Sequence, residues 1–134
     1  MDAAIALADL TEICSQVEAA VVLDEEGAVL ASTLAEESRT ERLARAGRGL
    51  LEAAEQLPTA GRRRPARVEA ALPRGSVFVA RCDRCAVVAT TPPGPASGLV
   101  FHDLETCLRA VAESRERPVP KPRRAPRKRK TVDA

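Results

Sequence analysis

Residues 76–91 read SVFVARCDRCAVVATT, and this stretch decides the fold that we expect. Two apolar runs flank Asp83–Arg84, which is the pattern of a β-hairpin with a two-residue turn. Pairing the runs across this turn puts on one face of the hairpin Phe78, Ala80, Cys82, Cys85, Val87 and Ala89. The other face then carries Val77, Val79, Arg81, Ala86, Val88 and Thr90. Both faces are mostly apolar, so we expect other elements to cover both of them.

The flanking sequence supplies these covering elements. The spacing of apolar residues predicts helices over 2–16, 40–57 and 99–116. Two further β-rich runs form a hairpin around Gly27, where we expect positive φ, and residues 66–72 alternate as a half-buried strand. The order helix-strand-strand-helix-strand-strand-strand-helix predicts an α/β (α+β) sandwich, with a central five-stranded antiparallel sheet and helices on both faces.

The segment 38–57 has the clearest helical pattern in the chain. Ser38 and Glu41 are spaced as a capping box, with Ser38 as the N-cap. The predicted apolar stripe consists of Leu43, Ala46, Leu50, Ala54 and Leu57. Gly47 and Gly49 each cost the helix about 1 kcal/mol relative to alanine. The sequence alone leaves two explanations for these glycines, which are close approach by another helix and neutral drift.

Charge divides the chain of 134 residues into two parts, for which we predict a folded domain over 1–112 and a tail over 113–134. The tail carries nine Lys/Arg and three Asp/Glu, a net charge of +6, whereas 1–112 carries twelve basic and sixteen acidic residues, a net charge of −4. No run approaches the ~18 apolar residues of a membrane span, and the first residues lack a basic signal-peptide region. We therefore expect a cytoplasmic protein.

The tail is rich in proline, arginine and lysine, which predicts an extended and disordered segment. A solubilising role is the simplest explanation. The alternative is an arm that binds nucleic acid, anionic lipid or an acidic partner. Its candidate contacts are Lys121, Arg123, Arg124, Arg127, Lys128, Arg129 and Lys130. Because the chain has two phenylalanines and neither tryptophan nor tyrosine, a stacking platform for single-stranded nucleic acid is not expected.

The pair Cys82–Cys85 permits three interpretations: apolar side chains at a hairpin end, a zinc knuckle or a redox dithiol. We favour the first, because a second pair of zinc ligands would have to come from Cys14, His102 or Cys107, and both cysteines lie on inward helical stripes. The chain has neither a P-loop nor a G-x-G-x-x-G motif. We therefore expect no catalytic residue, metal or cofactor, and a protein that is not an enzyme.

Two segments resemble the roadblock family, which includes dynein light chains and bacterial regulators of Ras-like GTPases. AAVVLDEEGAVLAS (19–32) looks like the first hairpin of that family, and SVFVARCDRCAVVATTPPGPASGLVFHDLETCLRAV (76–111) looks like its last hairpin, loop and helix. The helix at 40–57 lies where the family has its central helix, so the resemblance covers about residues 5–112. The chain departs from the family at Asp83–Arg84, where Asp-Gly is frequent.

The resemblance implies a homodimer formed through the central helices and the edge strand 66–72, with edge residues Arg67, Val68, Glu69 and Ala70. Such a strand independently favours pairing, because its backbone groups lack partners. The helix face implied to meet a GTPase comprises Arg42, Arg45, Arg48, Gly49 and Glu52. The expected function is a non-enzymatic homodimeric adaptor for a Ras-like small GTPase. The alternatives are a dimeric protein that binds nucleic acid or anionic surfaces through its tail, and a zinc or redox enzyme around Cys82, Cys85 and His102.

Overall fold

The computed structural model describes residues 2–58 and 66–116. Its elements are α1 (Ala3–Ile13), β1 (Ala19–Asp24), β2 (Val29–Ser32), α2 (Glu37–Glu55), β3 (Arg67–Leu72), β4 (Gly75–Arg81), β5 (Cys85–Thr91) and α3 (Ser97–Glu116). The predicted order of helices and strands is confirmed. Residues 59–65 and the predicted tail contacts from Lys121 to Lys130 lie outside the described residues.

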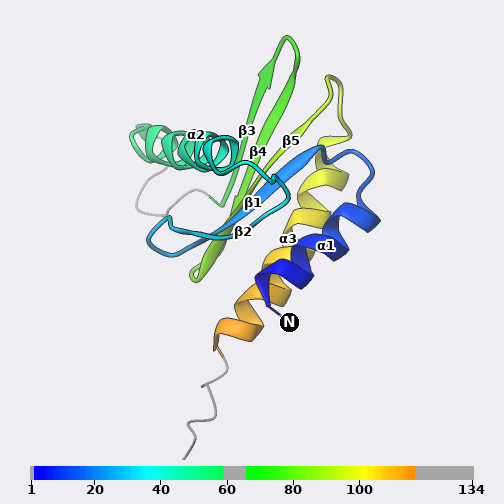
Figure 1. Cartoon of the computed structure of the whole chain (residues 1–134). Helices are drawn as coiled ribbons and strands as arrows, with labels where there is room; N and C mark the ends of the chain where they lie inside the picture. Colours follow the sequence, from blue (N-terminus) through cyan, green and yellow to red (C-terminus); the bar gives the residue numbers. More distant parts are fainter. Residues whose placement is uncertain (1, 59–65, 117–134) are drawn as a thin grey trace, which may run out of the picture.

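The strands form one antiparallel sheet in the order β2-β1-β5-β4-β3. Helices α1 and α3 lie along one face of this sheet, and α2 crosses the opposite face (Figure 1). This arrangement confirms the predicted sandwich with both faces covered. Within the described ranges, no helix is both long and apolar enough to span a bilayer.

The register of the β4–β5 hairpin is the one that its sequence predicts. Arg81 pairs with Ala86 and Phe78 pairs with Ala89, so Asp83 and Arg84 form the turn. Beyond the last paired residues, the Cys82 N–H donates to the Cys85 carbonyl at 2.9 Å. Because side chains alternate along a strand, this register sends the two predicted sets of side chains to opposite faces.

The core between the sheet and helices α1 and α3 is closely packed. Its centre is Phe78, whose ring meets that of Phe101 edge to face, with centroids 5.0 Å apart and planes at 74°. Leu104 from α3 is fully buried beside them, and α1 contributes Leu7 and Leu10. Each helix therefore buries one apolar stripe, as its spacing predicts.

The core under α2 differs from the prediction. The side of the helix that faces the sheet carries Thr40, Leu43, Ala44, Gly47 and Leu51. The predicted stripe is therefore wrong beyond Leu43, because Ala46 and Leu57 are exposed and Leu50 and Ala54 are only partly buried. An added Cβ at Gly47 would lie 2.2 Å from Cγ2 of Val88. Gly47 thus allows α2 to approach the sheet closely, and the close partner is a strand rather than another helix.

The predicted capping box is also wrong. Helix α2 begins at Glu37 after the N-cap residue Glu36, whose side chain makes no capping hydrogen bond. The first turn is instead attached to the end of β2, where the hydroxyl groups of Thr40 and Ser32 lie 2.7 Å apart. Ser32 Oγ also accepts from the Leu34 N–H at 3.0 Å. A contact with the preceding strand, eight residues earlier in the chain, therefore replaces the cap that the sequence favours.

Candidate functional site

The outward face of α2 is polar and partly flat. Its exposed side chains recur at spacings of three and four, opposite the buried stripe, and comprise Arg42, Arg45, Ala46, Gly49, Glu52 and Ala53. An added Cβ at Gly49 would meet no atom within 4 Å, the backbone of its own helix and the residues outside the described ranges aside. The structure therefore places four of the five predicted helix residues on one exposed surface, which we call the outer face of α2.

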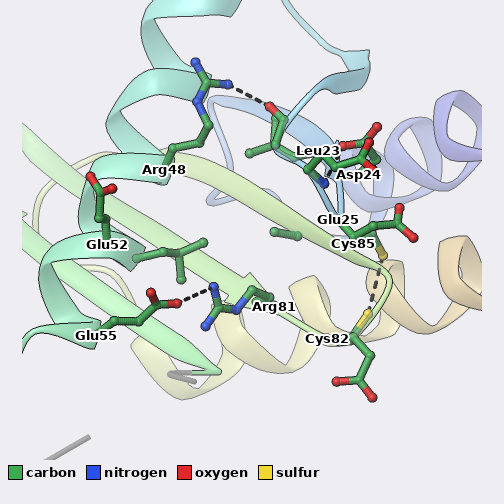
Figure 2. A pocket seen from close by; sticks show the side chains of 14 residues that line it. Leu23, Asp24, Glu25, Arg48, Glu52, Glu55, Arg81, Cys82 and Cys85 are labelled. Carbon is green, nitrogen blue, oxygen red and sulfur yellow. Dashed lines mark hydrogen bonds and ion pairs between the residues drawn. The ribbon is translucent and has the colours of Figure 1, made fainter. Parts of the chain in front are cut away.

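Arg48, the fifth predicted residue, points toward the β1–β2 turn. Its Nη1 donates to the Gly27 carbonyl at 2.8 Å, and its Nη2 pairs with Glu41 at 2.5 Å (Figure 2 shows the first of these contacts). Gly27 has a φ of 88°, which confirms the predicted positive φ. The Asp24 carboxylate completes the turn by accepting from two backbone N–H groups. Arg48 thus fastens this turn to α2, and its side chain is 35% exposed.

Strand β3 is an edge of the sheet, as predicted, because its neighbour on one side is β4 and it has no strand neighbour on the other among the described residues. The Ala66 carbonyl accepts from the Arg81 N–H at 2.9 Å. Because backbone groups alternate in direction along an antiparallel strand, residues 68, 70 and 72 then bond toward β4. The N–H and C=O groups of residues 67, 69 and 71 point outward. A second strand can pair with these groups.

The charged side chains of β3 are fixed to α3. Arg67 makes two hydrogen bonds to the Glu105 carboxylate, at 2.6 and 2.9 Å, and its guanidinium lies 5.3 Å from the ring centroid of Phe101. The bond from Arg67 holds the pKa of Glu105 below its usual value. Glu69 accepts from the Ser97 hydroxyl at 2.8 Å. Both carboxylates and Arg67 are thereby held on the α3 side of the sheet.

An acidic cleft of about 200 Å³ lies beside the second half of α2. Its walls come from α2, the β1–β2 turn and the tip of the β4–β5 hairpin (Figure 2). Six carboxylates line it, and these belong to Asp24, Glu25, Glu26, Glu52, Glu55 and Asp83. The only cationic side chains in its lining, within the described residues, are those of Arg48 and Arg81. The cleft is therefore suited to cationic rather than anionic groups.

Arg81 is a residue of this cleft that the sequence did not single out. Its side chain is only 10% exposed, and its Nη1 lies 3.1 Å from the Glu55 carboxylate. Its Nη2 is buried and has no hydrogen-bond partner within residues 2–58 and 66–116. The signal in the sequence was the position of Arg81 on a mostly apolar strand face. A guanidinium buried there requires a counter-charge from the element that covers the face.

The structure separates the residues of the predicted zinc or redox enzyme. Cys82 and Cys85 lie at the tip of the β4–β5 hairpin, whereas His102 lines an apolar groove of about 300 Å³ between α1 and α3. Cys107 borders that groove, but burial raises the pKa of its thiol to about 11. A thiol with so high a pKa is a poor nucleophile at neutral pH. In the described part of the chain, no three His, Cys, Asp or Glu side chains are grouped to hold a metal ion.

Comparison with known proteins identifies the family of this chain and solved structures that share its fold. The Roadblock/LC7 domain family matches residues 6–90. The chain belongs to this family. Solved structures extend the likeness to α3: that of a Roadblock/LC7 domain from Streptomyces avermitilis has a TM-score of 0.72 at 15% identity and covers 85% of this chain and 98% of its own.

Two further solved structures with the fold of this Roadblock/LC7 protein are of MglB, and that from Thermus thermophilus is a gliding protein. MglB from Thermus thermophilus has a TM-score of 0.63 at 21% identity, over 81% of this chain and 86% of its own. MglB from Myxococcus xanthus has a TM-score of 0.56 at 14% identity, over 84% and 85%. These likenesses are structural, since the identities are low. No curated protein sequence matches the chain.

Proposed function

We propose that this Roadblock/LC7 protein is a homodimeric, non-enzymatic adaptor that binds a Ras-like small GTPase on the outer face of α2. Membership of the family and the likeness to MglB support the proposal. Two neighbouring features of the structure carry it. One is the open edge of β3, and the other is the exposed outer face of α2, the helix that covers one face of the same sheet.

The proposed dimer is based on the open edge of β3, whose outward backbone groups can pair with a second strand. Antiparallel pairing of two β3 strands about a two-fold axis satisfies the outward backbone groups of residues 67, 69 and 71. On the α2 side of the sheet, pairing also brings together the partly buried Val68 and the 57% exposed Leu72 of both protomers. The two α2 helices then meet near this axis, where Ala46, Gly49 and Ala53 allow close approach.

The partner surface is the pair of α2 helices in the dimer. Arg42 and Arg45 project from each helix beside Glu52, so the surface presents fixed charges of both signs. A GTPase whose switch loops complement these charges in one nucleotide state binds that state more tightly. Differential affinity of this kind shifts the GTPase toward the bound conformation without any chemistry by the adaptor.

The dimer is tested by Glu69→Pro. Proline at position 69 removes an outward N–H but no bond to β4, so the protomer should stay folded while β3 pairing fails. Light scattering coupled to size exclusion should report a monomer for Glu69→Pro. Glu69→Ala is the matched control, because it loses the same contact to Ser97 but keeps the N–H, and it should remain a dimer. A dimeric Glu69→Pro variant would reject the β3 interface.

The partner is tested by titrating the small GTPases of the same organism, each loaded with GDP or a non-hydrolysable GTP analogue. We expect one of them to bind in a nucleotide-dependent way, and Arg42→Glu with Arg45→Glu to weaken binding at least about tenfold, through lost charge pairs. Arg109→Glu reverses one exposed charge on α3, half the change of the double variant, and should leave affinity unchanged. Failure of every GTPase to bind, or equal weakening by the α3 variant, would contradict the proposal.

A further inference from the structure

The two cysteines at the tip of the β4–β5 hairpin are in contact. Their Sγ atoms lie 3.5 Å apart (Figure 2), and the Cys82 N–H donates to the Cys85 carbonyl at 2.9 Å. Directly opposed residues of two antiparallel strands have Cα atoms about 4.5–5.5 Å apart. That separation is within the ~4.4–6.8 Å of known disulfides, which need an S–S distance of about 2.05 Å. A bond between these sulfurs therefore requires side-chain movement and little change in the backbone.

The two thiols differ in access. Cys85 is 1% exposed, and its sulfur lies 3.8 Å from the Leu108 carbonyl under α3. Burial, followed by the contact with Cys82, raises the pKa of the Cys85 thiol, so Cys85 is a weak nucleophile toward molecules in solution. It differs from Cys107 because its sulfur is already held 3.5 Å from the sulfur that it attacks. Cys82 is partly exposed and borders both the acidic cleft and a shallow groove with Arg109. A reagent from solvent thus reaches Cys82 first and finds Cys85 directly behind it.

The other two cysteines have no such arrangement. Cys14 and Cys107 are 2% and 5% exposed and pack in the core under α1 and α3. All four cysteines are free thiols in this structure. Selectivity for the hairpin pair therefore follows from exposure and from sulfur–sulfur contact together.

We propose that Cys82 and Cys85 are a redox-active dithiol that closes to an intramolecular disulfide on exposure to a peroxide or a small-molecule disulfide. With hydrogen peroxide, the Cys82 thiol gives up its proton and the thiolate attacks one oxygen. The O–O bond breaks, Cys82 becomes a sulfenic acid, and the departing hydroxide takes up the thiol proton to form water. The Cys85 sulfur then attacks the Cys82 sulfur, the S–O bond breaks, and the Cys85 proton departs with hydroxide as a second water. Two thiols lose two electrons and two protons, which the peroxide accepts.

With a small-molecule disulfide such as oxidised glutathione, Cys82 first forms a mixed disulfide and releases one thiol. Cys85 then displaces the second thiol as the internal bond forms. In both routes the oxidant reacts first with Cys82. Cys85 is the resolving residue, because it then attacks the Cys82 sulfur and forms the internal disulfide. Both cysteines line the acidic cleft, so the bond forms at its wall.

The test uses the reduced full-length protein with hydrogen peroxide, followed by alkylation of remaining thiols and tryptic mass mapping. We expect the number of alkylated thiols to fall from four to two. Trypsin cuts after Arg81, Arg84 and Arg109, so the disulfide should join the tripeptide 82–84 to the peptide 85–109. Because the second peptide also contains Cys107, the same link must form in Cys107→Ser.

Matched variants separate the roles of the two cysteines. With oxidised glutathione, Cys85→Ser should accumulate a mixed disulfide on Cys82, and Cys82→Ser should leave Cys85 unmodified. The internal disulfide in the unaltered protein supports the proposal. Four remaining thiols, a persistent adduct or over-oxidised Cys82, or a disulfide between two chains would each overturn it.

Discussion

The two faces of the sheet are covered in different ways. On one face, α1 and α3 lie side by side over a continuous core that includes Phe78, Phe101 and Leu104. On the other, α2 alone crosses the sheet, and Gly47 of this helix lies directly against Val88 of β5. Val68 is only partly covered there, and Leu72 on the same strand face is 57% exposed.

This difference indicates which face of the protomer is complete. The α1–α3 face buries the larger of the two apolar cores, so the stability of the protomer does not require a partner there. The α2 face has a thinner cover, an open strand edge and an exposed helix surface, which is where we propose the second protomer and the GTPase. Variants that change one face at a time therefore test whether the two faces differ in this way.

The largest expected effect is from equal truncations on the two faces. Leu104→Ala, at 0% exposure under α3, should lower the free energy of unfolding by about 4 kcal/mol, and Leu43→Ala, at 8% exposure under α2, by about 2 kcal/mol. The α2 site loses less because its surroundings collapse more easily. Denaturant unfolding at one protein concentration measures both, and a reversed order would show that the α2 face is the better packed.

The next effect compares two glycines of α2. At Gly47 an added methyl group would lie 2.2 Å from Val88, so Gly47→Ala should destabilise the protein by about 2 kcal/mol despite the higher helix propensity of alanine. At Gly49 the same change meets open space and should stabilise the protomer by about 0.5–1 kcal/mol. Thermal unfolding of both variants in the monomeric Glu69→Pro background is the measurement. Equal effects would mean that α2 does not approach the sheet at Gly47.

A smaller effect concerns the acidic cleft. Glu55→Gln leaves the buried Arg81 guanidinium without its carboxylate at 3.1 Å, and we expect a loss of about 1–2 kcal/mol in the free energy of unfolding. Glu52→Gln makes the same change one turn earlier on an exposed residue, and it should alter stability by less than about 0.5 kcal/mol. If Glu52→Gln is the more costly variant in urea unfolding, the counter-charge of Arg81 has been assigned to the wrong residue.

The smallest effect depends on pH and concerns the exposed pair of Arg67 and Glu105. The folded pKa of Glu105 is lowered by Arg67, so the pair stabilises the protein above the ordinary glutamate pKa. That stabilisation is lost as the pH falls through the lowered, folded pKa. Glu105→Gln should therefore be slightly less stable than the parent at neutral pH, and the two should converge in acid. Unfolding curves over a series of pH values test this, and a difference that grows toward acid would contradict it.

Much of the fold was predictable because its signals are local. The alternation of side chains through 76–91 and the two-residue turn were enough to predict the register of β4 and β5. Gly27 marked the β1–β2 turn, and the spacing of apolar residues predicted the last helix, in which Val100, Leu104 and Leu108 are buried. These predictions hold because strand period, turn chemistry and a wide apolar stripe act within a few residues of each other.

The candidate site was predictable only in part. The outward positions of Arg42, Arg45, Gly49 and Glu52 agree with helical spacing, and the edge position of β3 agrees with its half-polar pattern. The turn contact of Arg48 and the burial of Arg81 were not predictable, because each depends on a partner far away in the sequence.

The sequence by itself determined the order of the elements, the register of the β4–β5 hairpin and the two faces of its strands, because these follow from side-chain period and turn residues. Only the tertiary structure decided which side of α2 meets the sheet. The predicted stripe placed Ala46, Leu50 and Ala54 inward, whereas the side that packs on the sheet carries Gly47, which has no Cβ to clash with Val88. The same holds for Cys82 and Cys85. The sequence pattern places them opposite each other in the hairpin, but only the packing brings their sulfur atoms within 3.5 Å of each other.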